Sequence, residues 1–147
     1  MLLAEVGTYL AAQSTAVPFN TTLTRGTNLF EGELGPGAGT ATDPVTQVAI
    51  VEYGGPPPEH TLGGETTRIE MARFQVRVRH ATFATGRLLI QQISAALVAI
   101  GGNETLSGVK YLSIDALQSN PTQLPRDDNR RWHWTWNFEA MKEPSTS

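Results

Sequence analysis

The sequence contains no cysteine, so disulfide bonds, thiolate metal sites and cysteine nucleophiles are excluded. No apolar run approaches the roughly 20 residues that a membrane-spanning helix requires, and no membrane partner is expected. The N-terminal segment has an early acidic residue, Glu5, and no basic region before its apolar residues. We therefore expect no signal peptide.

Charged residues are also few, at 17% of the chain, and the net charge of −3 does not suggest a general nucleic-acid-binding protein. The three histidines, His60, His80 and His133, are not at metal-ligand spacing. Residues 127–129 lack the glycine and the closing glutamate of a calcium loop, and the glycines at 101–102 end a helix rather than open one. We expect no metal, no cofactor and no enzymatic activity.

We expect the rest of the chain to pack around one stretch, residues 69–80. It alternates with period two, which is typical of a strand with two different faces. The apolar face carries Ala72, Phe74, Val76 and Val78, and the basic face carries Arg73, Gln75, Arg77 and Arg79. Residues 83–100 then change to a period of 3.6, which predicts a helix directly after the strand.

The remaining segments predict a second helix at residues 2–13 and strands at 29–34, 45–53, 109–117 and 131–141. The expected class is α+β, with a four- to five-stranded, mainly antiparallel sheet and two helices packed on one of its faces. We predict one domain over residues 1–142 and a disordered C-terminal tail at 143–147.

Residues 54–67 show no periodicity and include three consecutive prolines, which are stiff and extended. A stretch of this length without structure is unusual inside a domain and is often functional. We predict a projecting loop that contacts other proteins through Gly54, Gly55, Pro56, Pro57, Pro58, His60 and Leu62.

Residues 131–141 place Trp132, Trp134, Trp136 and Phe138 on one face of a strand. Such a row could stack on bases or sugars. Packing under the long helix is the favoured interpretation, because one face of the sheet must be filled by bulky apolar residues.

The arginines at 73, 77 and 79 could be solvated, could contact a phosphate backbone or could meet carboxylates of a neighbouring subunit. The acidic net charge argues against the phosphate backbone. We expect a subunit interface, and its candidate residues are Arg73, Arg77, Arg79, Asp115, Asp127, Asp128 and Glu139.

Several segments, in this order and spacing, resemble the tail terminator proteins of long-tailed, siphovirus-like bacteriophages, the phage minor capsid protein family. The resemblance runs from Leu2 to Ala140 and begins with the short N-terminal helix. Its other carriers are LFEGEL (29–34) before a Gly-Pro turn, VEYGGP (51–56), FQVRVR (74–79) with the helix after it, SNPTQLPRDDNRR (119–131) and WNF (136–138).

The resemblance implies a structural protein that forms a ring, commonly a hexamer, on the last ring of tail-tube subunits. The ring would stop tube growth and meet the head-completion or connector proteins at the head–tail junction of the virion. Genomic DNA would pass through it without specific binding, and assembly would take place in the host cytoplasm. Two alternatives are another head–tail connector or tail-completion protein of similar fold, and a small module that binds single-stranded nucleic acid.

Overall fold

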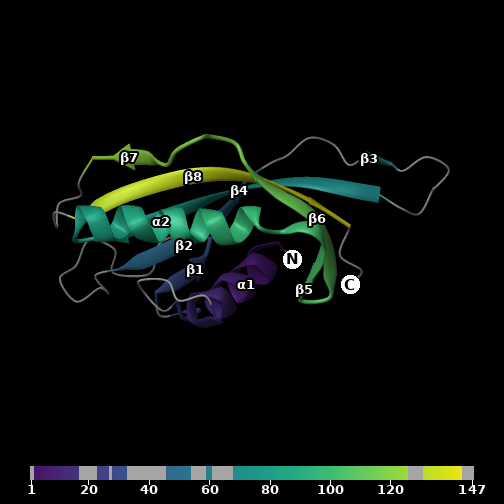
Figure 1. Cartoon of the computed structure of the whole chain (residues 1–147), viewed down its shortest axis with the longest axis horizontal. Helices are drawn as coiled ribbons and strands as arrows, with labels where there is room; N and C mark the ends of the chain where they lie inside the picture. The colour runs from purple at the N-terminus through teal and green to yellow at the C-terminus, as the bar shows by residue number, and fades with distance from the viewer. Residues whose placement is uncertain are drawn as a thin grey trace.

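The computed structural model describes residues 2–16, 23–26, 28–32, 46–53, 59–60, 68–125 and 131–143. This part of the chain forms two helices and eight strands, and Figure 1 shows how they are arranged. In chain order they are α1 (Leu2–Ala16), β1 (Leu29–Glu31), β2 (Gln47–Tyr53), β3 (Glu59–His60), β4 (Arg68–His80), α2 (Phe83–Val98), β5 (Gly101–Leu106), β6 (Val109–Ala116), β7 (Thr122–Leu124) and β8 (Trp132–Lys142).

The strands join in the order β1-β2-β4-β8-β6-β5, and two short strands pair at the side, β3 with β4 and β7 with β8. The alternating strand around which the chain was expected to be organised, β4, pairs antiparallel with both β2 and β8. Strands β6 and β8 are antiparallel neighbours. Strand β4 is therefore a central strand of the sheet. Its long apolar face packs beside the side chains of both neighbouring strands.

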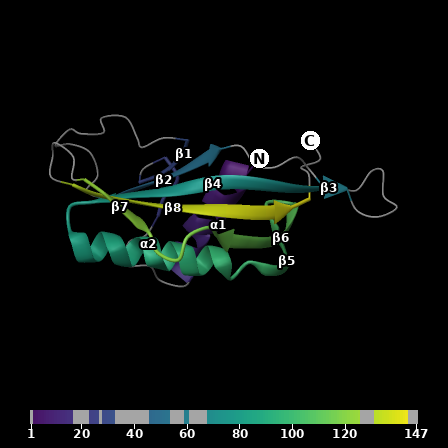
Figure 2. The same ribbon diagram turned by 90° about the horizontal axis from the view of Figure 1, so that it is seen from above.

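Both predicted helices are present, and their side chains join one core with the sheet. Val48, Val78 and Trp134 lie opposite one another in register and share the sheet face that this core covers. Figures 1 and 2 show α2 running lengthwise along β4 and β8 on one side of the sheet. Helix α1 contacts β1, β2, β5 and α2.

The sheet is larger than the four to five strands predicted, and it is mixed rather than antiparallel throughout. Strands β1 and β2 are parallel, which requires a crossover connection and cannot be read from either strand alone. Strand β5 was missed because its opening glycines were interpreted only as a helix stop. It forms a hairpin with β6 through Ser107 and Gly108, both at positive φ, as a tight two-residue hairpin turn requires.

Strand β3 lies within the expected projecting loop. It pairs with Arg68 and Ile69 of β4, whereas β8 begins to pair with β4 only at Glu70 and β2 only at Arg73. The β3–β4 hairpin therefore extends beyond the main sheet, at one end of the long axis (Figures 1 and 2). The rest of the loop, including residues 54–58 and Leu62, lies outside the described residues, as does the tail from residue 144.

Candidate functional site

The sheet face opposite the helices is polar and carries most of the interface residues predicted from the sequence. We call this surface the polar face. Its described members are Arg73, Gln75 and Arg77 of β4, Asn137 and Glu139 of β8, and Asp115 of β6. Register places Arg73, Glu139 and Asp115 in one row across three strands, and Gln75 and Asn137 in the next row.

These rows are bonded within the chain. The Arg73 Nε atom donates to Glu139 Oε2 at 2.9 Å, and the Gln75 amide donates to Asn137 Oδ1 at 3.0 Å. Arg77 donates from Nε to Gln75 Oε1 at 2.7 Å. Arg73 and Glu139 thus meet within one subunit, because antiparallel pairing of β4 and β8 sets the two side chains directly opposite each other. Their place in a subunit interface stays a prediction.

The other predicted interface residues differ in their placement. Arg79 has only 1% of its surface exposed, so it is part of the subunit interior and not of a free surface, contrary to its predicted place in an interface. Asp115 is exposed and lies opposite Glu139. Asp127 and Asp128 lie outside the described residues. Arg77 and Asp115 are therefore the accessible interface residues of the described surface that are not in an ion pair, whereas Arg73 is accessible but paired with Glu139.

The tryptophan row packs under α2, which confirms the favoured interpretation. Trp134 is 1% exposed, and Phe83 of α2 lies against it with ring centroids 5.4 Å apart. Trp136 is also buried, and its indole N–H donates to the backbone oxygen of Gln118. Because both rings are covered, they offer no open stacking platform for bases, and the nucleic-acid-binding alternative loses its main support.

A buried polar cluster escaped the sequence analysis. Glu5 of α1 accepts a hydrogen bond from the Tyr111 hydroxyl at 2.7 Å and pairs with Lys142 of β8 at 3.3 Å. Burial alone would raise the pKa of Glu5, but the hydrogen bonds it accepts and the charge of Lys142 hold that pKa below its usual value. Burial and the neighbouring carboxylate raise the pKa of Tyr111. In the last strand every second residue points to the core, and Lys142 follows Ala140 at this spacing. The sequence could therefore have predicted that Lys142 points to the core.

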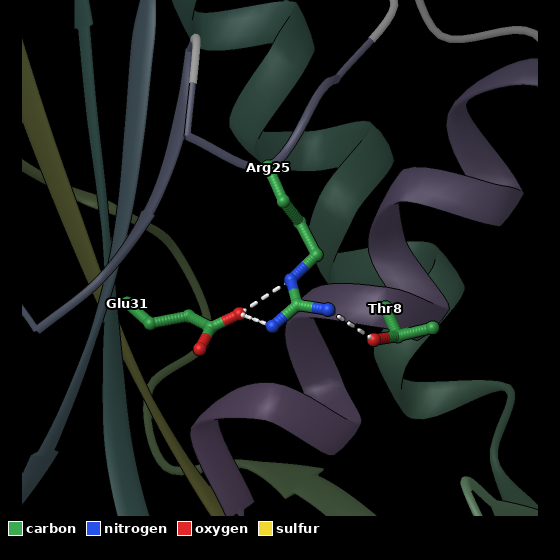
Figure 3. Close-up of polar contacts among 3 residues, drawn as sticks. All are labelled: Thr8, Arg25 and Glu31. Carbon is green, nitrogen blue, oxygen red and sulfur yellow. Dashed lines mark hydrogen bonds and ion pairs between the residues drawn. The ribbon is translucent and has the colours of Figure 1, made fainter.

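A second polar group joins α1 to β1 at the surface. Figure 3 shows the Arg25 guanidinium between Glu31 and Thr8. Its Nε donates to Glu31 Oε1 at 2.6 Å, and its Nη1 donates to Thr8 Oγ1 at 3.0 Å. The hollow beside this group is lined by Arg25, Gly26, Leu29, Phe30 and Glu31. Because Arg25 already has an anionic partner, this contact holds the helix against the sheet edge rather than forming a site for an anion.

Within the described residues, no three histidines, aspartates or glutamates converge in a way that could hold a metal ion. None of the described helices has the length and apolar character needed to cross a membrane. Of the predicted loop contacts, only His60 lies in a described segment, in β3.

Comparison with known protein families shows to which family the chain belongs. A family model described as "Bacteriophage tail terminator protein" matches residues 36–144, which include every strand from β2 to β8. The chain belongs to the bacteriophage tail terminator family. The resemblance noted in the sequence is thereby confirmed, and family membership indicates a structural, non-enzymatic role related to the phage tail.

One solved structure shares the fold of this tail terminator family member. It is a chain in the virion of a native gene transfer agent (GTA) particle, with a TM-score of 0.62 and 20% sequence identity. The alignment covers 97% of the present chain and 95% of the other. No protein among the curated sequences matches the chain.

Proposed function

We propose that the chain forms a closed hexameric ring on the last ring of tail-tube subunits. The ring stops elongation of the tube and offers a surface to the head-completion or connector proteins. The observation that carries this proposal is the family match over residues 36–144. The fold shared with a chain of a gene transfer agent virion supports a location in the virion. Within the virion we propose the head–tail junction as the position of the ring, and the host cytoplasm as its place of assembly.

A ring of identical subunits needs two different surfaces on each subunit that fit each other head to tail. The described surface offers such an asymmetry, because one side of the sheet is covered by helices and the other is the polar face. We assign Arg77 and Asp115 to the subunit interface, since both are accessible on the polar face. Arg73 takes part indirectly, by holding Glu139 in place beside Asp115.

Genomic DNA passes through the proposed ring without specific binding. Each phosphate neutralised by a free cation would release counterions and strengthen binding, which would hold back a genome that must slide. The chain is acidic overall, and the Arg73 guanidinium on the polar face is already paired with Glu139. Both observations support passage without retention.

The projecting loop at residues 54–62 is proposed to contact the tail tube or the connector. Its described part, β3, extends past the main sheet at one end of the molecule, where it is well placed to reach a protein above or below the ring (Figure 2). Deletion of residues 56–63 should leave a folded ring that fails to complete tails. If the deletion instead unfolds the subunit, as measured by circular dichroism, the loop is part of the core and this assignment is wrong.

The direct test of the ring is size-exclusion chromatography with light scattering. Six copies of a 15.9 kDa chain give about 95 kDa. A monomer or dimer, both alone and in the presence of purified tail tubes, would contradict the proposal. A second test measures tube length by electron microscopy: tubes assembled without this protein should be longer and more variable than tubes assembled with it.

A further inference from the structure

The outward face of α2 is unusually apolar for a solvent-exposed helix. The helix has a single charged residue, Arg87, and no acidic residue. Three of the six large hydrophobic residues that are exposed in the described chain belong to it: Phe83 at 40%, Leu88 at 46% and Val98 at 45%. The outward stripe is formed by Ala84, Arg87, Leu88, Gln91, Ala95 and Val98, opposite the buried stripe that contacts the sheet.

A stripe of this composition is typical of a surface that another protein covers, because exposed apolar patches of this kind are uncommon on free monomers. Within the described part of the chain, Arg87 makes no ion pair. A surface that covers the stripe would bury Arg87 without a partner unless it offers a carboxylate near it as well as apolar atoms.

The polar face of the same chain offers that combination. Asp115 lies directly opposite Glu139, and like charges in this position repel each other. The one cation in the row, Arg73, is bonded to Glu139, so the row has a carboxylate in excess. Leu117 follows two residues after Asp115, is 45% exposed, and donates its backbone N–H to Asn137. An exposed carboxylate and an exposed leucine therefore lie side by side at the end of β6.

We propose that the outward stripe of α2 docks on the polar face of a second copy of this chain, with Arg87 paired to Asp115 and Leu88 packed on Leu117. The two surfaces lie on opposite sides of the subunit, one on the helix layer and one on the far face of the sheet. Such a contact is head to tail and repeats from subunit to subunit, which is the arrangement that a closed ring requires. The inference rests on the proposed function, and it names the interface of that ring.

A crosslinking experiment tests the contact. The chain has no native cysteine, so cysteines introduced by Arg87→Cys and Asp115→Cys in one chain are the only reactive thiols. They lie on opposite sides of the sheet, so a short bis-maleimide cannot join them within one subunit. The double variant should give a covalent ladder that ends at the ring size, and either single variant should give none. Rings of the double variant with no ladder would overturn the inference and leave the ring proposal standing.

Charge and packing variants give an independent readout. Arg87→Glu and Asp115→Lys should each weaken the ring by about tenfold or more in native mass spectrometry at a series of concentrations, and the two together should restore it. Leu88→Glu should also disrupt the ring, whereas Leu124→Glu, a matched change at a leucine 39% exposed on β7, should not. Equal effects of the two leucine variants, or no rescue by the double charge exchange, would overturn the inference. Failure of the unaltered protein to form rings would instead overturn the proposed function.

Discussion

A glycine near the start of α2 offers the sharpest test of how the core is packed. Gly86 lies where the helix crosses the sheet, and a Cβ atom added there would be 2.4 Å from Cζ3 of Trp134 and 2.8 Å from Cβ of His80. Carbon atoms in contact are ordinarily about 3.5–4.0 Å apart. Trp134 is 1% exposed and Cβ of His80 is fixed to the backbone of β4, so neither atom can move without displacing the sheet or the helix.

Two opposing effects decide the stability of Gly86→Ala. Replacement of glycine by alanine within a helix ordinarily gains about 1 kcal/mol. Overpacking of a well-packed core ordinarily costs about 1–3 kcal/mol, and the close approach to two fixed groups places this site at the upper end. We expect a net loss of about 2 kcal/mol in the free energy of unfolding, which corresponds to a fall in Tm of roughly 4–8 °C for a chain of this size.

Chemical denaturation followed by tryptophan fluorescence measures this loss, and Gly7→Ala in α1 is the matched control. A Cβ at Gly7 would meet only the side chain of Glu31, with Oε1 at 2.9 Å and Cδ and Cγ at 3.5 Å, and this side chain is partly exposed and can move. Gly7→Ala should therefore be neutral or stabilising by up to about 1 kcal/mol. Equal stabilisation by both substitutions would refute the reasoning. Combining Gly86→Ala with Trp134→Phe should cost less than the sum of the two single changes, because the smaller ring removes the atoms that clash.

Four further predictions concern single sites. Trp136→Ala should lower the free energy of unfolding by about 3–5 kcal/mol in denaturant titrations, because the indole is buried and bonded to Gln118. Lys142→Met removes the lysine that pairs with the buried carboxylate of Glu5 and should lower the free energy of unfolding by about 3–5 kcal/mol, and a second change, Glu5→Gln, should recover part of this loss. Burial lowers the pKa of His80 in the folded chain below its usual 6.5, so the unfolded chain takes up a proton first as the pH drops. The free energy of unfolding should therefore fall between about pH 6.5 and the pKa of the folded state. In His80→Asn, Tm should depend less on pH in that range. Arg77→Glu should weaken the ring in native mass spectrometry, and normal rings with altered DNA ejection would place Arg77 in the lumen instead.

The sequence by itself determined the elements whose pattern is local. The alternation in β4 and β8 and the 3.6-residue period in α2 are carried by neighbouring residues, so both strands and the helix were predicted close to their observed bounds. The burial of Trp134 followed from the same pattern, because a sheet with one apolar face must cover that face. Short strands such as β3 and β7 have too few residues for a period to show, and a parallel pair such as β1 with β2 depends on a connection rather than on either strand.

Only the tertiary structure decided which charged groups meet. Arg73 was predicted to lie on a basic face, but its partner Glu139 is 66 residues away, and only the register of β4 against β8 brings the two together. Glu5 and Lys142 are separated by 137 residues, and only the docking of α1 on the sheet brings the two side chains together. Local periodicity assigns a side chain to a face, whereas register and helix docking assign its partner. The sequence therefore predicted the polar face, and the fold determined that Asp115 shares one row of it with Glu139 and Arg73.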